Sequence, residues 1–378
     1  MLDDPCIWTI LTARNSAQVL KILSREQVDI LVVNVCMENM GGSKLLETMQ
    51  AKHPRTTRVA MTDNSSRELG LLSVNTAHQF ISKPLQPEAV REIMQRTLAL
   101  RQTLNKASLQ GAVSQMGTLP SLPAHFNQLM EELNSPEASI KKVGQLISHD
   151  PAMTTKLLQL INSAFFGLPK HISTSEQAVN LLGLEMIKAL ALSIHIFTRF
   201  NGPSASLDYV QKLFDHCLRT GMLAKSIARL EGLDKRQVDN AFLSGLVHDT
   251  GKLILTCQLP KDFARITSKA VNSSRPSHTL EMEHLGSSHA EVGAYLLGLW
   301  GIPGDIVENV AFHHLPQKSP RSSFSALTAV HVANALDHIA HYSPELAGDK
   351  DVDLNHLDQL GLADSLSRWK EVLQDIQE

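Results

Sequence analysis

The sequence predicts a multidomain protein in which an α/β unit with a parallel sheet is followed by an all-α unit. Up to about residue 100, short β-rich segments alternate with helical segments, which is the pattern of a parallel sheet covered by helices. From Leu119 onward, strand signals nearly vanish and helical periodicity continues to the end. The length of 378 residues also exceeds that of one ordinary domain.

The N-terminal unit, residues 1–100, is expected to contain four strands and the helices between them. The strands are expected at 6–11, 30–35, 58–62 and 79–82. The helices are expected near 15–26, 42–52 and 66–75. A last helix is expected from about 87 to 113, and a helical linker over 101–118 leads into the next unit.

The C-terminal unit, residues 119–378, begins at the turn-rich segment Leu119-Pro120-Ser121-Leu122-Pro123. A loop over 200–206 divides it into subdomains 119–203 and 204–378. Its helices are expected at 124–134, 139–148, 151–162, 175–182, 184–199, 207–231, 235–248, 260–273, 281–299, 303–313, 323–343 and 353–376.

Composition excludes several classes of protein. A net charge of −3 argues against general binding to nucleic acid. The four cysteines are scattered without Cys-x-x-Cys spacing, which is typical of a reducing compartment. No apolar run is long enough to insert into a membrane, and no cleavable signal opens the chain. We therefore expect a cytoplasmic protein.

The most informative motif is the doublet His248-Asp249, which ends an apolar run and is followed by Gly251 and Lys252. A neutral imidazole and a carboxylate together suit Fe, Mn, Zn or Mg. Glycine frees the backbone, and the lysine ammonium can bind a phosphate. The doublet therefore predicts a metal-and-phosphate site, provided that other ligands converge on it.

Several other polar residues fall on inward-facing positions of separate predicted helices. These are His216, His289, His313, His314 and Asn334. Burying them in a dry core is costly unless they meet one another or a metal ion. A metal-capable pocket and a metal-free, hydrogen-bonded polar core both remain open. The other nearby histidines are expected at solvated positions: His278, His284, His338 and His341.

These motifs make residues from about 110 to 340 resemble an HDOD domain, an HD-like signalling output domain. In the first half, the resemblance rests on Ser148-His149-Asp150-Pro151, Ile161-Asn162-Ser163-Ala164-Phe165-Phe166-Gly167, Gln177-Ala178 and Leu181-Leu182-Gly183. In the second half, it rests on Gly245-Leu246-Val247-His248-Asp249-Thr250-Gly251-Lys252-Leu253, Glu283, His289-Ala290-Glu291-Val292-Gly293, Trp300-Gly301-Ile302-Pro303 and His313-His314. The resemblance implies an all-α fold and a role in bacterial signalling, without a settled activity.

The second half is also similar to the HD-GYP phosphodiesterases, which hydrolyse cyclic dinucleotides. That similarity implies a mononuclear or dinuclear metal site. It assigns metal ligation to His216, His248, Asp249, His289, His313, His314 and Asn334, and a phosphate contact to Lys252. Asn334 stands where an aspartate is expected, Lys212 where some relatives carry a glutamate, and the Gly-Tyr-Pro signature is absent. Asp337, one turn along from Asn334, is a candidate substitute ligand.

The first hundred residues resemble a truncated receiver domain of two-component signalling, whose fold is flavodoxin-like. Asn34 occupies the position of the phosphoacceptor aspartate, Thr62 that of the switch residue and Lys83 that of the receiver lysine. An amide cannot form an acyl phosphate, and the acidic pair that binds Mg²⁺ is missing. The first receiver strand is also missing, which leaves sheet edges that a homodimer could cover.

We therefore expect a bacterial signalling regulator whose HDOD domain acts as a protein-interaction or ligand-sensing module under a receiver that is not phosphorylated. Its partners would be kinases or cyclic-dinucleotide enzymes, and its ligand a nucleotide. The alternative is a metal-dependent phosphohydrolase or phosphodiesterase acting on a nucleotide or cyclic dinucleotide, with Asp249 and Lys252 in the reaction. The amide at Asn334 weighs against catalysis, because it brings no charge to the metal.

Overall fold

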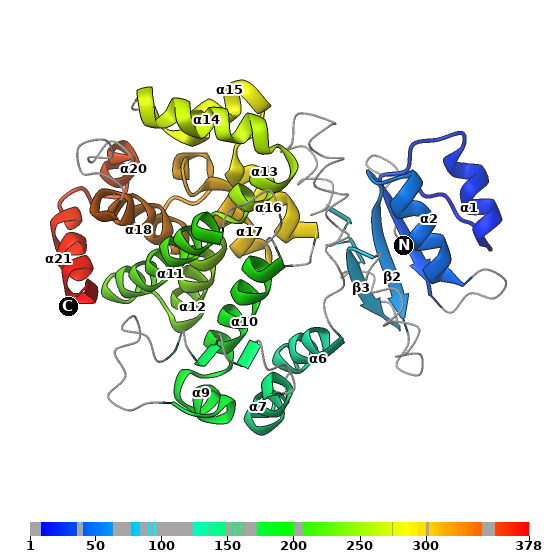
Figure 1. Cartoon of the computed structure of the whole chain (residues 1–378), viewed down its shortest axis with the longest axis horizontal. Helices are drawn as coiled ribbons and strands as arrows, with labels where there is room; N and C mark the ends of the chain where they lie inside the picture. Colours follow the sequence, from blue (N-terminus) through cyan, green and yellow to red (C-terminus); the bar gives the residue numbers. More distant parts are fainter. Residues whose placement is uncertain are drawn as a thin grey trace. The chain divides into compact units, whose positions relative to one another are not determined.

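The structure is a computed structural model, shown in Figure 1, and it describes most of the chain. The described residues are 9–35, 41–62, 77–83, 90–91, 94–95, 124–135, 137–148, 153–154, 157–158, 161, 172–199, 207–273, 275–299, 302–341 and 352–377. They separate into two compact units that divide near residue 122. The first unit holds a parallel sheet and the second is helical, so the predicted fold class is confirmed.

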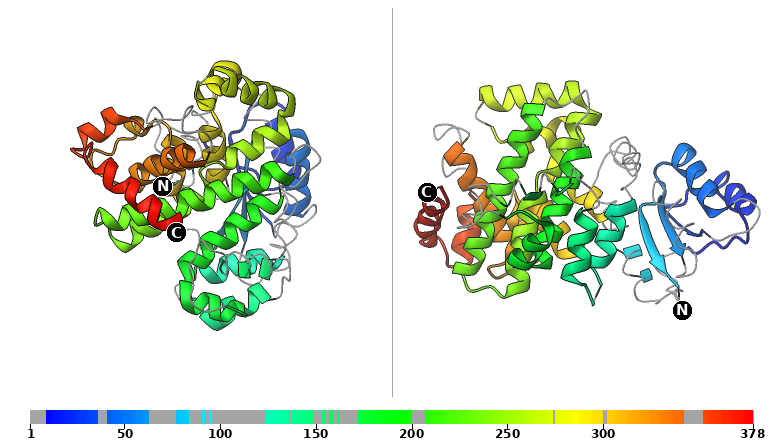
Figure 2. Two further views of the ribbon diagram at one scale, coloured as in Figure 1. Left: turned by 60° about the vertical axis from the view of Figure 1, so that its left-hand side comes forward. Right: turned by 60° about the horizontal axis from the view of Figure 1, so that its bottom comes forward.

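The N-terminal unit is a three-stranded parallel sheet in the order β1-β2-β3, formed by Ile30–Asn34, Thr57–Thr62 and Gln79–Ser82. Helices α1 (Ser16–Leu23) and α2 (Gly42–Lys52) lie on one side of it (Figures 1 and 2). Val33 and Ala60, on adjacent strands, pack with Leu46 and Met49 of α2 in a buried cluster. The alternation of side chains along the strands thus supplies the apolar face that both helices cover.

The strand expected at 6–11 does not form over the part that can be followed. Thr9–Leu11 has no strand pairing, and the side chains of Ile10 and Leu11 are exposed. Among the described residues, β1 pairs only with β2, so its other edge has no strand beside it. The helix expected near 66–75 and the linker 101–118 lie outside the described residues.

All the regular elements among the described residues of the second unit are helices. Its helices are α6 (Ala124–Leu133), α7 (Ile140–Ser148), α9 (Ser175–Leu182), α10 (Leu184–Arg199), α11 (Leu207–Leu230), α12 (Lys235–Val247), α13 (Thr250–Gln258), α14 (Pro260–Ser273), α15 (Ser277–Leu285), α16 (His289–Leu299), α17 (Gly304–Phe312), α18 (Ala326–His341), α20 (Leu354–Gln359) and α21 (Ser365–Gln377), with a 3₁₀ turn at Pro316–Lys318. In the described parts of the chain, no helix combines the length and apolar character that a membrane span needs.

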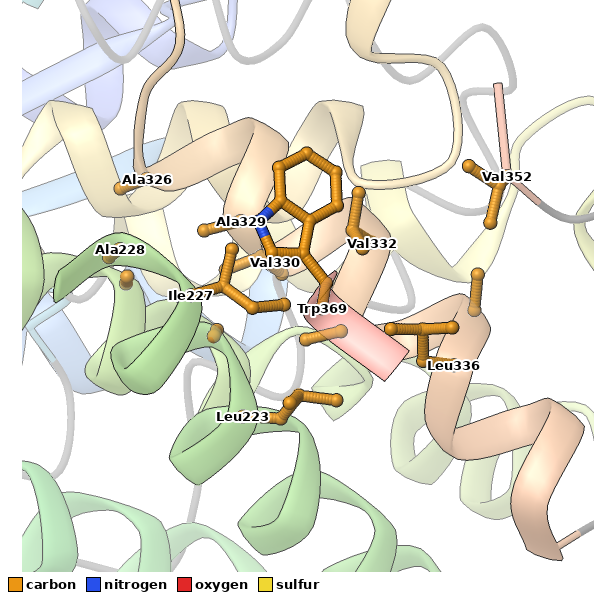
Figure 3. Close-up of a cluster of buried hydrophobic side chains, with 14 of the residues drawn as sticks. Leu223, Ile227, Ala228, Ala326, Ala329, Val330, Val332, Leu336, Val352 and Trp369 are labelled. Carbon is orange, nitrogen blue, oxygen red and sulfur yellow. The ribbon is translucent and has the colours of Figure 1, made fainter. Parts of the chain in front are cut away.

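Helices α11, α12 and α18 form the centre of this unit (Figure 2). Gly221 of α11 and Gly245 of α12 let the two backbones approach so closely that a Cβ on Gly245 would lie 2.6 Å from the Gly221 Cα. At one end, Leu223 and Ile227 of α11 pack with Leu336 of α18 around the fully buried Trp369 of α21 (Figure 3). The central helices are therefore held in fixed positions relative to one another.

Two helix predictions are wrong in the same way, because continuous periodicity hides breaks. The segment 281–299 is two helices, since Gly286 ends α15 with a left-handed φ of 75°. The segment 353–376 is likewise split, and Gly361 with φ 69° lies between α20 and α21. Helix α13, which starts directly after the doublet, was not predicted at all. Each break redirects the chain toward or around the site described next.

Candidate metal centre

The predicted polar residues meet inside the helical unit, although they come from five parts of the chain. His216 lies on α11, His248-Asp249 at the junction of α12 and α13, and His289 at the start of α16. His313-His314 follow α17, and Asn334 lies on α18. The side chains are buried, except that His314 is half-buried. The structure therefore brings together all seven residues that the sequence suggested as ligands.

The first donor group consists of His216 Nε2, His248 Nε2, Asn334 Oδ1 and Asp249 Oδ2. The two Nε2 atoms are 3.2 Å apart. Asn334 Oδ1 lies 3.1 Å from His216 Nε2 and 3.2 Å from His248 Nε2. Asp249 Oδ2 lies 3.5 and 3.4 Å from the same two nitrogens. Bonds of about 2.1 Å to one metal ion would separate neighbouring donor atoms by about 3.0–3.5 Å.

The second donor group consists of His289, His313, His314 and the other oxygen of Asp249. His289 Nε2 lies 3.1 Å from Asp249 Oδ1 and 3.0 Å from His314 Nε2. His313 Nε2 is 3.9 Å from the same carboxylate oxygen. The three histidines can offer ligand atoms that all lie within 4.8 Å of one another. One carboxylate thus contributes an oxygen to each donor group.

In four of these five histidines, the other ring nitrogen, Nδ1, faces an acceptor. His248 Nδ1 donates to the Gly245 carbonyl and His313 Nδ1 to the Val310 carbonyl, both at 2.8 Å. His216 Nδ1 donates to Asp337 at 2.7 Å, and His289 Nδ1 donates to Glu281 at 2.6 Å. A ring that is neutral, with its proton on Nδ1, directs its Nε2 lone pair at the neighbouring donor atoms. Lone pairs that face one another repel unless a cation lies between them.

The charge and burial of these side chains also favour a divalent cation between them. Burial lowers the pKa of His313 and His314 well below the ordinary value, so both rings are neutral ligands. Burial opposes ionisation of Asp249, but His248 and Lys252 outweigh it and hold the carboxyl pKa well below normal. His313 Nε2 is buried and has no hydrogen-bond partner among the described residues. Neutral imidazoles around an ionised carboxylate match a divalent cation.

Lys252 lies beside the centre on α13. Its Nζ is 2.6 Å from Asp249 Oδ2, and 13% of its side chain is exposed. Burial alone would lower the lysine pKa, but the Asp249 carboxylate outweighs it and raises the pKa. In this structure the ammonium therefore neutralises Asp249, while the phosphate contact expected for it remains a prediction.

Gly251 is required by packing, which is a different reason from the one the sequence suggested. A Cβ at this position would lie 1.9 Å from the His289 carbonyl oxygen and 2.9 Å from the Gly293 amide nitrogen. Helices α13 and α16 therefore touch backbone to backbone at this point. The close contact brings the doublet next to His289.

Asp337 does not take the place of the missing ligand aspartate. Its carboxylate binds His216 Nδ1, on the ring nitrogen that points away from the first donor group. It also accepts hydrogen bonds from Arg219 Nε at 2.6 Å and Arg219 Nη2 at 3.0 Å. Asp337 therefore orients a ligand instead of being one, and Asn334 supplies the oxygen. Lys212 is exposed and pairs with Asp208.

Two histidines that were expected in solvent are half-buried against the ligands. The His278 ring stacks on His314 with centroids 4.2 Å apart, and the His338 ring lies 4.6 Å from that of His216. The sequence prediction was wrong there because both residues lie at helix positions that only tertiary packing covers.

Glu281 is a residue of the site that sequence reasoning missed. Its Oε2 accepts from the His289 backbone N–H at 2.7 Å as well as from the ring. Burial would raise the glutamate pKa, but His289 outweighs it and lowers the pKa. The neighbouring Glu283, which the motif comparison named, is exposed and pairs with Arg275. Only the break at Gly286, which folds α15 back on α16, distinguishes the two glutamates.

The receiver-like residues share one edge of the N-terminal sheet. Asn34 ends β1, Thr62 ends β2 and Lys83 directly follows β3. Because the strands are parallel, these three positions lie at the carboxyl edge, where receiver chemistry takes place. The three positions therefore share the sheet edge that the receiver resemblance predicts for them, and the one at the end of β1 carries an amide.

In this helical unit, Asp249 places one carboxylate oxygen near each of two histidine groups, an arrangement that fits the HD-type resemblance. Consistent with this, residues 119–316 match the model of the HDOD domain, so the chain belongs to the HDOD family. Residues 1–95 match the response regulator receiver domain.

Several known proteins are similar to this chain. A Treponema pallidum protein of uncharacterised function is 26% identical over 244 residues, which are 65% of this chain and about half (47%) of that protein. A Shewanella amazonensis structure, provisionally named a phosphohydrolase, has a TM-score of 0.57 and 22% identity over 72% of this chain and 95% of its own. An HDOD protein of unknown function from Geobacter sulfurreducens has a TM-score of 0.52 and 19% identity over 76% and 99%. These structures support the fold.

Proposed function

We propose that the helical domain is a divalent-metal-binding module of a signalling protein, and that it acts under a receiver that is not phosphorylated. The observation that carries this proposal is the close approach of the Nε2 atoms in the first donor group, while the Nδ1 of each ring faces an acceptor. The Nε2 atoms of His216 and His248 are 3.2 Å apart, and both rings have their protons fixed on Nδ1. A metal-free polar core would place a donor hydrogen between such atoms.

His216, His248 and Asn334 would hold one cation, and His289, His313 and His314 a second, with Asp249 shared. A bound divalent cation would supply Lewis acidity toward phosphate oxygens. Lys252, once released from Asp249, would bind a phosphate of a nucleotide ligand. A kinase or a cyclic-dinucleotide enzyme in the cytoplasm would then receive the state of the module. These last assignments of ligand, partner and location rest on the sequence motifs.

Metal analysis of the purified full chain tests the proposal. We expect at least about one Mn, Fe or Zn per chain after purification without chelator, and a large loss in His248→Ala. His53→Ala, which alters a histidine after α2, is the matched control and should retain the metal. Fewer than about 0.2 metal ions per chain, with none gained on titration with Mn²⁺, would remove this proposal.

A second candidate function is metal-dependent hydrolysis of a phosphate ester. It is favoured by the two oxygens of Asp249, which reach both donor groups, and by the adjacent Lys252. The fold neighbour from Shewanella amazonensis carries a phosphohydrolase name. Turnover of nucleotides and cyclic dinucleotides by the Mn²⁺-loaded chain, absent in Asp249→Asn, would support this function. If the chain binds metal but hydrolyses neither nucleotides nor cyclic dinucleotides, the non-enzymatic metal-binding module is the function that stands.

A further inference from the structure

The segment 352–377 lies beyond the part of the chain that matches the HDOD model, yet it packs into the same core. Val352 and Trp369 belong to the buried cluster shown in Figure 3. The Trp369 indole N–H donates to Glu231 at 2.8 Å, and Arg368 pairs with the same carboxylate. The segment is therefore an integral part of the helical unit.

One buried histidine joins this segment to the second donor group. His331 of α18 donates from Nδ1 to the His313 carbonyl at 2.7 Å. Its other nitrogen, Nε2, accepts from the Asp353 backbone N–H at 2.8 Å. The two partners require opposite roles of the two nitrogens, which only the neutral ring with its proton on Nδ1 can supply. Both bonds are thus made at once, and the ring is 1% exposed.

The carbonyl that His331 holds belongs to a ligand residue. His313 has its ring tied to Val310 and its backbone tied to His331, and it is followed directly by His314. Removing His331 would leave a buried carbonyl without its partner, so the turn carrying both ligands would shift. Groups that orient ligands typically change metal affinity by about 10–100-fold.

We propose that His331 is a positioning residue for the second donor group, and that the segment from Asp353 onward sets the metal affinity of that group through it. The inference rests on the proposed metal-binding function and deepens it. A purely structural His331 would lower stability without distinguishing the two donor groups, because the first group has no bond to His331 among the described contacts.

The test uses four variants of the full chain. His331→Phe removes both hydrogen bonds at similar size. Asp353→Pro removes the donating N–H together with the side-chain carboxylate, and the φ of −74° at this position already suits proline. Asp353→Ala retains the N–H but loses the carboxylate that caps α20, so it controls for the cap. His356→Phe removes another buried histidine of the segment, bonded to Thr328 and not to the ligand turn.

Mn²⁺ binding is measured by competition with a chelator, and folding by circular dichroism. We expect His331→Phe and Asp353→Pro to lower the Mn²⁺ affinity of the second donor group about tenfold or more, while the affinity of the first donor group stays unchanged. Asp353→Ala and His356→Phe should bind both ions like the wild type. If folded His331→Phe and Asp353→Pro bind both ions with the affinities of the wild type, the inference is overturned. If the wild type itself binds no metal, the proposed function is contradicted instead.

If the wild type binds no metal, hydrogen exchange of the metal-free chain still tests whether His331 positions the turn that carries His313 and His314. The amides of residues 313–315 should exchange at least about tenfold faster in His331→Phe and Asp353→Pro than in the wild type and His356→Phe. If exchange in this turn is the same in all variants, His331 does not position the ligand turn.

Discussion

Asn334 determines the charge of the first donor group. Its Oδ1 lies within 3.2 Å of both ligand nitrogens but carries no negative charge, so Asp249 is the single carboxylate that faces them. Affinity for a divalent cation increases with the number of charged ligands. The position where the HD-type resemblance expects an aspartate can therefore be altered directly.

Replacing this amide by a carboxylate should strengthen metal binding. We expect Asn334→Asp to bind Mn²⁺ about tenfold more tightly, because a second negative charge faces the cation. The metal-free variant should melt at a lower temperature than the wild type, since two buried carboxylates then repel each other. Asn180→Asp, on the exposed face of α9, makes the same charge change and should leave both properties unaltered. Weaker metal binding in Asn334→Asp would show that position 334 does not face the metal.

Buried neutral histidines also make stability depend on pH. Burial lowers the pKa of His331 to about 4, whereas an unfolded histidine has a pKa near 6.5. Between these values the unfolded chain binds more protons, so the stabilisation is fully present above about pH 6.5 and is lost as pH falls. For His331 the loss is about 1 kcal/mol between pH 6 and pH 5.

Urea unfolding of the metal-free chain at pH 6 and pH 5 measures this effect. The free energy of unfolding should decrease by about 1 kcal/mol more in the wild type than in His331→Phe, because only the wild type takes up a proton at His331 on unfolding. An equal decrease in both proteins would mean that His331 is charged in the folded state.

Inward-facing residues could be predicted from the sequence, but their exact roles could not. Helical periodicity placed His216 and Asn334 on apolar faces, and the structure brings them together. It could not distinguish Asn334, which faces the ligand nitrogens, from Asp337, which holds the far side of His216. Both side chains are buried one helical turn apart, and only the packing of α18 against α11 decides which of them faces the Nε2 atoms.

At the scale of elements, close helix contacts position the ligands. Helices α13 and α16 meet at Gly251, and α11 and α12 meet at Gly221 and Gly245. The helix bounds themselves were largely predictable, because α9, α10 and α14 follow uninterrupted periodicity between capping residues. The breaks at Gly286 and Gly361 were not, because a left-handed glycine inside an apolar pattern gives no periodic signal.

Gly251→Ala tests the contact between α13 and α16. The added Cβ would overlap the His289 carbonyl, so the helices must separate. We expect the variant to lose about 3 kcal/mol or more of stability, and the remaining folded protein to bind metal poorly. Gly304→Ala is the matched control, because nothing lies within 4 Å of its Cβ position. Chemical unfolding and metal titration measure both effects, and wild-type metal binding in a stable Gly251→Ala would refute the contact.

At the scale of the whole molecule, a receiver-like unit without its phosphoacceptor precedes an HDOD domain with a full set of candidate ligands. The order of the two units was predictable from the change in periodicity near residue 119. The strand expected at 6–11 does not form over Thr9–Leu11, and β1 has one unpaired edge among the described residues.

The receiver unit should not accept a phosphoryl group. Incubation of the chain with acetyl phosphate and Mg²⁺ should give no added phosphate by intact mass, because the Asn34 amide cannot form an acyl phosphate. Asn34→Asp should also stay unlabelled, since the acidic pair that would hold Mg²⁺ is missing from the sequence. Labelling of the wild type would contradict the assignment of a degenerate receiver, and labelling of the variant alone would mean that another residue binds Mg²⁺.

The two oxygens of Asp249 have a consequence for how the centre would fill. Oδ2 faces the first donor group and Oδ1 the second, so one negative charge serves two cations. The first cation to bind uses most of that charge and then repels the next. The two groups would therefore load in sequence at well-separated metal concentrations. Such a module would have three distinguishable states, empty, half-filled and full, and its output could be graded with the supply of metal in the cell.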